Sequence, residues 1–274
     1  MARLRTLACT LAAAGCAATV LTAPARADGN VKDAPAESKR KVEFSWNIGA
    51  TTDYVFRGVS QSSEDPAFQA GFDITYGIFY LGAWGSGIDF DDAPPANVEI
   101  DWYAGIKPKW GKLTFDFGVI YYSYPNAGSL ANFVGEIADL NYVEVKAGVS
   151  GSPIDKLTLG ATAFYSPDYQ YSSGPVWTLE GTAAYEFPKF WLFTPTISAL
   201  IGYQTGDSSE GFSVDGTARD DYVYWNAGLA LAVEKLTLDF RYWDTNIGTA
   251  NGGTVCAATQ LCDERSVFST KVTF

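Results

Sequence analysis

Apolar and polar side chains alternate along the chain from Val42 to its last residue. In residues 42–53, for example, Phe44, Trp46 and Ile48 share one face of an extended chain, and small, polar or charged residues share the other. Because successive side chains of a strand point to opposite faces of a sheet, this period predicts strands with one apolar and one polar face. The pattern predicts about twelve strands, in residues 42–53, 68–76, 80–88, 98–107, 113–122, 143–149, 157–163, 177–185, 197–203, 225–233, 236–242 and 265–274. Pro195, at the start of the ninth, leaves the count open by one hairpin.

The connections between these segments alternate in length. Short ones, several with lysine, fall at 77–78, 107–112, 150–156, 186–191 and 234–235, and longer ones at 57–66, 89–97, 124–140, 166–175, 204–221 and 244–265. Short turns at one end and long loops at the other are typical of a transmembrane antiparallel up-and-down β-barrel, with periplasmic turns and extracellular loops. A soluble sandwich shares the alternation within strands but has no reason to sort its loops in this way.

Aromatic residues gather near both ends of the expected strands. They are Trp46, Tyr76, Trp110, Tyr185 and Trp191 at the short-turn end, and Tyr54, Phe56, Tyr165, Trp177, Tyr203 and Trp225 towards the long loops. This distribution predicts two aromatic belts at the membrane interfaces, although core aromatics of a large soluble β-protein are the alternative.

The last segment, Arg265–Phe274, resembles the terminal strand of bacterial outer-membrane barrels, because it alternates and ends on an aromatic residue. In those proteins the barrel-assembly machinery reads this segment, so the resemblance implies that Phe274 is an assembly signal. An open sheet edge cannot be satisfied in hydrocarbon, and the last strand is therefore expected to pair with residues 42–52.

The first 27 residues have the features of an export signal. Arg3 and Arg5 precede an apolar run, and Ala25-Arg26-Ala27 is a cleavage site of the A-x-A type, so we expect cleavage after Ala27. A lipoprotein acylated on Cys16 is the weaker alternative. The polar residues 28–41 are expected to form a flexible periplasmic lead-in, and 42–274 the barrel. No later apolar run reaches the roughly 18 residues that a membrane helix needs.

Charge and composition exclude several functions. Removal of Arg3, Arg5 and Arg26 lowers the 19 basic residues to 16 against 31 acidic ones, and the formal net charge falls from −12 to −15. Such a chain is expected to bind no nucleic acid, because that binding depends on phosphate neutralisation. Histidine is absent, which removes the commonest general base and metal ligand. We therefore expect no enzyme, no cofactor and no metal site.

The polar face of the expected strands is predicted to line a lumen. Its candidates for solute contact or selectivity are Asp53, Arg57, Asp73, Glu99, Asp101, Asp116, Glu144, Lys146, Glu180, Asp239 and Arg241. Acidic residues outnumber basic ones in this set. Cys256 and Cys262 lie in a Gly/Thr-rich stretch, and in an exported protein they are candidates for one short loop-closing disulfide.

Three smaller groups have two interpretations each. Asp53 and Arg57 form either a charged constriction or, as the geometry favours, an ion pair that fixes the strand end. The acidic cluster at Asp89, Asp91 and Asp92 could bind divalent cations or bridge them to lipopolysaccharide, but a solvated loop is the simpler interpretation. The tyrosines at 121, 122 and 124 are either a sugar-binding track or, more simply, part of an aromatic belt.

Several blocks resemble the TorF-type porin family of proteobacteria over essentially the whole mature chain. They are Asp53 to Gln61 (DYVFRGVSQ), Tyr80 to Phe90, Tyr121 to Pro125, Asn141 to Val145 and Tyr242 to Asn246, of which the first is the most specific. The resemblance implies an outer-membrane barrel with porin function, and it implies the location more firmly than the solute. The loop with Cys256 and Cys262 departs from the family pattern.

Two functions remain at this point. The first is a narrow, acid-lined channel for passive diffusion of small solutes that favours cations. The second is a non-conducting structural, adhesive or receptor barrel whose lumen is filled by side chains. A barrel of about twelve strands lies between filled small barrels and open porins, so strand number does not decide between them. In either case the expected surroundings are outer-membrane lipid and lipopolysaccharide.

Overall fold

The computed structural model describes residues 41–90, 96–125, 127, 130–131, 137–138 and 140–274. The expected signal sequence and its cleavage site lie outside these residues, as do residues 28–40 of the lead-in and the side chains of Asp91 and Asp92. Among the described residues, no helix has the length and apolar character needed to cross a membrane.

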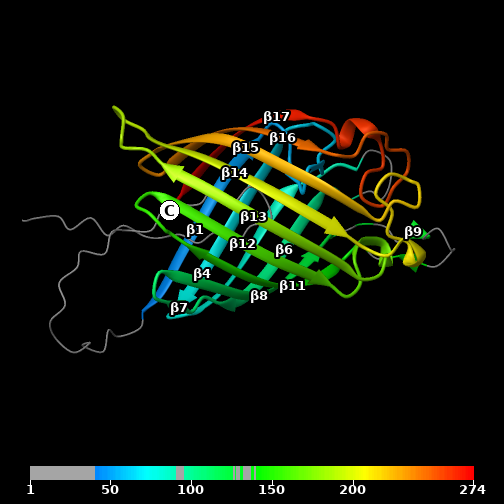
Figure 1. Cartoon of the computed structure of the whole chain (residues 1–274), viewed down its shortest axis with the longest axis horizontal. Coiled ribbons are helices and arrows are strands. Elements are labelled where there is room, and N and C mark those ends of the chain that lie inside the picture. The colour runs from blue at the N-terminus through cyan, green and yellow to red at the C-terminus, as the bar shows by residue number, and fades with distance from the viewer. Residues whose placement is uncertain (1–40, 91–95, 126, 128–129, 132–136, 139) are drawn as a thin grey trace, which may run out of the picture.

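Twelve long antiparallel strands form a closed barrel (Figure 1). They are β1 (Val42–Thr51), β4 (Ala67–Tyr76), β5 (Phe79–Gly87), β6 (Val98–Ile106), β8 (Leu113–Ser123), β11 (Tyr142–Gly151), β12 (Leu157–Ser166), β13 (Val176–Glu186), β14 (Thr194–Thr205), β15 (Asp221–Val233), β16 (Leu236–Thr245) and β17 (Arg265–Thr273). The predicted fold class and strand number are confirmed. Pro195 is the second residue of β14 and adds no hairpin.

Shorter elements lie in the connections. The strands are β2 (Val55–Phe56), β3 (Val59–Ser60), β7 (Lys109–Trp110), β9 (Leu130–Ala131) and β10 (Ile137–Ala138), and the 3₁₀ turns are η1 (Gln170–Ser172), η2 (Ser208–Glu210) and η3 (Thr259–Leu261). The long connections gather at one end of the barrel and the short turns at the other, as Figure 1 shows. We call these the long-loop end and the short-turn end.

The barrel closes between its first and last strands. β1 pairs with β17 from Asn47 opposite Thr273 to Thr51 opposite Ser269. Beyond this ladder the Phe274 N–H donates to the Trp46 carbonyl at 2.9 Å, and the two rings stack with centroids 3.9 Å apart. No edge is left between these strands, which meets the requirement for a sheet in an apolar solvent.

The outer surface of the wall is apolar. Phe44, Trp46 and Ile48 are exposed, as are Phe72, Leu81, Trp102, Phe117, Val145, Leu179, Ile201, Trp225 and Phe240 from other strands. Residues of the opposite parity face inward and are mostly buried, among them Asn47, Asp73, Asp101, Glu144 and Asn226. Alternation therefore predicted correctly which face of each strand lies outside.

Some expected belt aromatics lie inside instead. Tyr54 is 1% exposed, and Phe56 packs against Tyr122 in the interior, because both follow the end of β1 in a connection that turns into the barrel. Tyr122 and Tyr124 are buried as well, whereas Tyr121 is exposed on the outer face. The belt interpretation is thus wrong for Tyr54, Phe56, Tyr122 and Tyr124.

Candidate functional site

The connection from β1 to β4 folds into the barrel. We call residues 52–66 the inward loop; they include the small hairpin β2–β3. Arg57 and Gly58 form its turn with φ angles of 51° and 84°, and a Cβ on Gly58 would lie 2.5 Å from the Thr245 methyl carbon. Glycine suits this position for two reasons: it adopts a positive φ without strain, and it has no Cβ to clash with Thr245.

Arg57 fixes the tip of the inward loop to the opposite wall. Its Nη1 and Nη2 atoms each donate to one carboxylate oxygen of Glu144 at 2.8 Å. The hydroxyl of Tyr122 donates to Glu144 Oε2 at 2.9 Å, and that of Tyr222 donates to the Arg57 carbonyl at 3.2 Å. β11, which holds Glu144, is separated from β1 by four strands along the shorter way round the sheet, so the loop crosses the lumen.

The expected ion pair between Asp53 and Arg57 is wrong. Asp53 instead accepts hydrogen bonds from Arg265 Nη1 at 2.9 Å, Ser60 Oγ at 2.6 Å and Ser62 Oγ at 3.0 Å. The prediction assumed that period-two geometry continues to residue 57, but β1 ends at Thr51 and the chain turns inward. Both residues anchor the loop, at its base and at its tip respectively.

Two further carboxylates face the inward loop from β6. The hydroxyl of Tyr54 donates to Glu99 Oε1 at 2.6 Å, and Asp101 lies two residues further along the same face. Glu99, Asp101 and Glu144 are 2%, 1% and 0% exposed. Three of the predicted acidic residues are thus buried near the long-loop end of the lumen, and one of them, Glu144, pairs with Arg57.

The other predicted residues lie apart from this cluster. Towards the short-turn end, Asp116 accepts from Lys146 Nζ at 2.9 Å and from the Tyr80 hydroxyl at 2.7 Å, and Asp73 accepts from the Tyr103 hydroxyl at 2.7 Å. On another part of the wall, Arg241 pairs with Asp239 at 3.0 Å, and Glu180 accepts from the Tyr224 hydroxyl at 2.6 Å. Each of these carboxylates therefore has a lysine, an arginine or a tyrosine hydroxyl as its partner.

Several interior residues were not among the sequence candidates. Lys107 lies 3.6 Å from Asp116, and Arg265 pairs with Asp53. Tyr222 and Tyr224 are each 1% exposed and contact the inward loop or Glu180. The sequence could have identified both tyrosines as inward-facing, because they alternate along β15 with the outward-facing Trp225.

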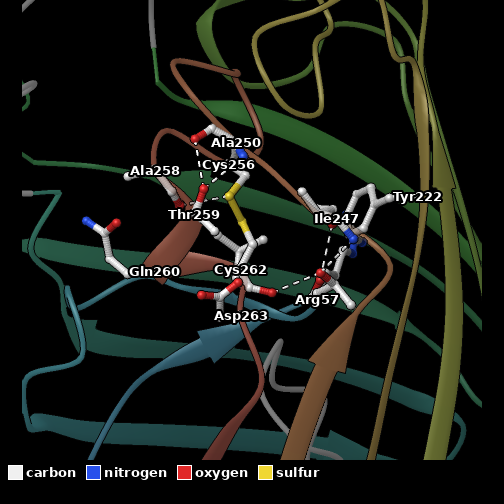
Figure 2. The surroundings of a disulfide bond; sticks show 12 residues. Arg57, Tyr222, Ile247, Ala250, Cys256, Ala258, Thr259, Gln260, Cys262 and Asp263 are labelled. Carbon is white, nitrogen blue, oxygen red and sulfur yellow. Dashed lines mark hydrogen bonds between the residues drawn. A yellow bond between two sulfur atoms is a disulfide. The ribbon is translucent and has the colours of Figure 1, made fainter.

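Connections at the long-loop end pack over the inward loop. Cys256 and Cys262 are joined by a disulfide, which Figure 2 shows together with Arg57, Tyr222 and Ile247. The Cys256 N–H donates to the Val214 carbonyl at 3.1 Å. This bond links the connection of residues 206–220 to that of residues 246–264. Phe212, Val214 and Cys256 are fully buried in this layer.

The connection between β12 and β13 completes the layer. The Tyr169 ring lies at 4.7 Å from Tyr142 and 6.2 Å from Phe212, centroid to centroid. Burial raises the pKa of Tyr171 to about 12, so this phenol is neutral at ordinary pH. Gln170 Nε2 donates to the Tyr124 hydroxyl at 3.0 Å and ties this connection to the wall. The long-loop end is therefore filled by side chains.

Comparison with known proteins identifies the fold. A search of curated protein sequences found no match. Among solved structures, the KdgM porin is similar with a TM-score of 0.53 and 11% identity, over 84% of this chain and 98% of that one. The NanC porin is similar with a TM-score of 0.50 and 12% identity, over 85% and 99% of the two chains. A KdgM porin in complex with disordered oligogalacturonate gives 0.52 and 10%, over 84% and 97%.

At these identities the likeness to porins shows a shared barrel architecture. At the level of sequence, the model of a family described as a bacterial protein of unknown function (Gcw_chp) matches residues 35–274. This match covers the whole barrel, and the chain belongs to that family.

Proposed function

We propose that this chain is an outer-membrane, porin-like channel for passive diffusion of small solutes. The observation that carries the proposal is a closed barrel of porin fold with an apolar outside and a charged, hydrogen-bonded inside. An apolar outer face is stable against hydrocarbon, whereas buried ionic groups are retained at a cost in stability and often have functional roles. The motif resemblance to TorF-type porins is consistent with this function.

The channel is proposed to favour cations. At the long-loop end Arg57 pairs with Glu144 and Arg265 with Asp53, while Glu99 and Asp101 have no cationic partner among the described residues. The loops there add Asp207, Glu210, Asp215 and Asp220 against Arg219. Carboxylates in a narrow passage raise the local concentration of cations and lower that of anions. Towards the short-turn end Lys107 and Lys146 offset Asp116, so selectivity is set mainly near the inward loop.

The inward loop controls passage in this proposal. It crosses the lumen, and its residues Tyr54, Val55, Arg57 and Val59 are at most 5% exposed. With the loop in this position the channel is narrow or closed, and solutes pass when the loop leaves the wall at Glu144.

The same filled lumen favours a second candidate, a non-conducting structural, adhesive or receptor barrel. Its supporting observation is the packed layer above the inward loop, in which Phe212, Val214 and Cys256 are inaccessible to solvent. In this alternative the loop stays in place and residues 206–220 and 246–264 present a binding surface.

The cellular setting is part of the proposal. An export signal cleaved after Ala27, recognition of the strand ending at Phe274 by the barrel-assembly machinery, and contact with lipopolysaccharide all fit an outer-membrane barrel. The apolar band on the outer wall is expected to lie in the lipid.

Recording of single-channel currents in planar bilayers separates the two functions. Folded wild-type protein, identified by heat-modifiable mobility in gels, is compared with the variant Arg57→Met, which lacks the hydrogen bonds between the inward loop and Glu144. Discrete current steps that become more frequent in the variant support the channel. Absence of current from both folded proteins contradicts it and favours the non-conducting barrel.

A further inference from the structure

Asp101 is a buried carboxylate with no hydrogen-bond partner among the residues that the structure describes. It lies on β6 with its side chain facing the lumen and is 1% exposed. Neither Oδ1 nor Oδ2 accepts a hydrogen bond from any residue that the structure describes. Since burial of an unpaired charge is costly, a ligand or a proton must compensate this group.

The hydroxyls of Tyr122 and Tyr54 and the terminal nitrogens of Arg57 bond to carboxylates other than Asp101, while Arg57 Nε has no hydrogen-bond partner among the described residues. Tyr122 is the direct neighbour of Asp101 on β8, and its hydroxyl donates to Glu144. Tyr54 donates to Glu99, and both terminal nitrogens of Arg57 bind Glu144. Glu144 thus accepts three hydrogen bonds, whereas Asp101 accepts none from the residues that the structure describes.

The charge of the cluster is negative. Glu99 and Glu144 both act on Asp101 electrostatically. Arg57 compensates Glu144, while Glu99 and Asp101 have no cationic partner among the described residues. Two like charges on one strand face, two residues apart, repel each other strongly in a medium that excludes water.

Protonation is the competing way to remove the charge of Asp101. It leaves the acid hydrogen in need of an acceptor, and the cation dependence of wild-type stability separates the two cases. A cation, in contrast, needs only oxygen ligands and π faces. Trp84 and Tyr122, the residues directly opposite Asp101 on β5 and β8, are buried aromatic neighbours of the kind that attract cations.

We propose that Asp101 and Glu99 form a binding site for a small monovalent cation within the lumen, flanked by the rings of Trp84 and Tyr122. A single positive charge is proposed because the site offers two carboxylates and two aromatic rings, fewer oxygen atoms than the roughly six to eight that Ca²⁺ takes. This site rests on the proposed channel function. The cation reaches Asp101 through the lumen and is the ion that the channel conducts.

Thermal unfolding of the full-length barrel in detergent tests the site. The folded protein is titrated with sodium, potassium or methylammonium chloride against N-methylglucamine chloride at constant ionic strength, and tryptophan fluorescence reports unfolding. A cation that binds only the folded state at 100 times its Kd raises the folded-to-unfolded ratio about 100-fold. We expect this gain for at least one of the three cations, and their comparison separates a metal ion from an organic ammonium ion.

Two variants with the same chemical change supply the control. Asp101→Asn is expected to abolish the cation-dependent gain, and Asp155→Asn, at an exposed turn carboxylate, to retain it. Should Asp101→Asn fail to fold, Glu99→Gln and sodium NMR line broadening on the wild-type protein provide the same test. Unfolding that is independent of the cation, or a gain that persists in Asp101→Asn, overturns the site.

The outcomes also distinguish the site from the channel. Cation-selective currents without any cation-dependent stability refute the site and leave the channel intact. Cation-dependent stability that needs Asp101, without current from the wild-type or Arg57→Met protein, refutes the channel and retains the site.

Discussion

Replacement of Arg57 by methionine is expected to release the inward loop from the wall. The Arg57 and Glu144 side chains are 3% and 1% exposed and joined by two hydrogen bonds of 2.8 Å, so solvent screens their attraction little. Removal of one partner from a buried pair leaves an unpaired charge and costs about 3–5 kcal/mol. At roughly 1.4 kcal/mol for each factor of ten, the loop-in state loses about a thousandfold in population relative to a released state.

This effect has two readouts. Single-channel recordings of Arg57→Met should show a much higher open probability than the wild type, and its free energy of unfolding should fall by about 3–5 kcal/mol if the loop remains in place until the barrel unfolds. The matched control is the double variant Arg57→Met/Glu144→Gln, which removes the unpaired charge and should recover much of the loss. If the single variant matches the wild type in both current and stability, the pair does not fix the loop and the reasoning is refuted.

Three other changes have defined outcomes. Replacement of Cys256 and Cys262 by serine opens a crosslink with a sequence separation of 6 and should lower stability by about 2 kcal/mol in chemical denaturation, whereas an unchanged midpoint contradicts this. Deletion of Phe274 removes its stacking on Trp46 and should lower the heat-modifiable barrel recovered from outer membranes more than total expression; normal assembly would contradict an assembly role. Glu99→Gln should reduce the ratio of cation to anion permeability, and an unchanged reversal potential would argue against this carboxylate as a selectivity group.

Strand number and facing could be predicted because both depend on local sequence. Strand geometry alone imposes a period of two. The alternation therefore places Phe44 and Trp46 on the outer face of the wall and Asp101 and Glu144 on the inner face. The alternation of short and long connections predicted the two ends of the barrel in the same way. Those carboxylates were therefore found as lumen candidates before their partners were known.

The partners could not be predicted because they depend on tertiary structure. Arg57 and Glu144 are 87 positions apart, and their pairing requires the chain after Thr51 to leave the strand and cross the lumen. Extension of the strand period beyond Thr51 wrongly paired Asp53 with Arg57 and placed Tyr54 in an outer belt. The Arg57-Gly58 dipeptide within the segment YVFRGVS was the available signal for a turn, since glycine favours positive φ.

The reversal potential of the folded protein in a planar bilayer with a potassium chloride gradient tests the central claim most directly. Wild-type and Arg57→Met proteins are measured side by side, so that a closed inward loop in the wild type does not hide the channel. The structure predicts ion currents, at least in the variant, with a reversal potential of the sign given by potassium permeating faster than chloride. Absence of current from both proteins, or a reversal potential of the opposite sign, would contradict a cation-favouring channel.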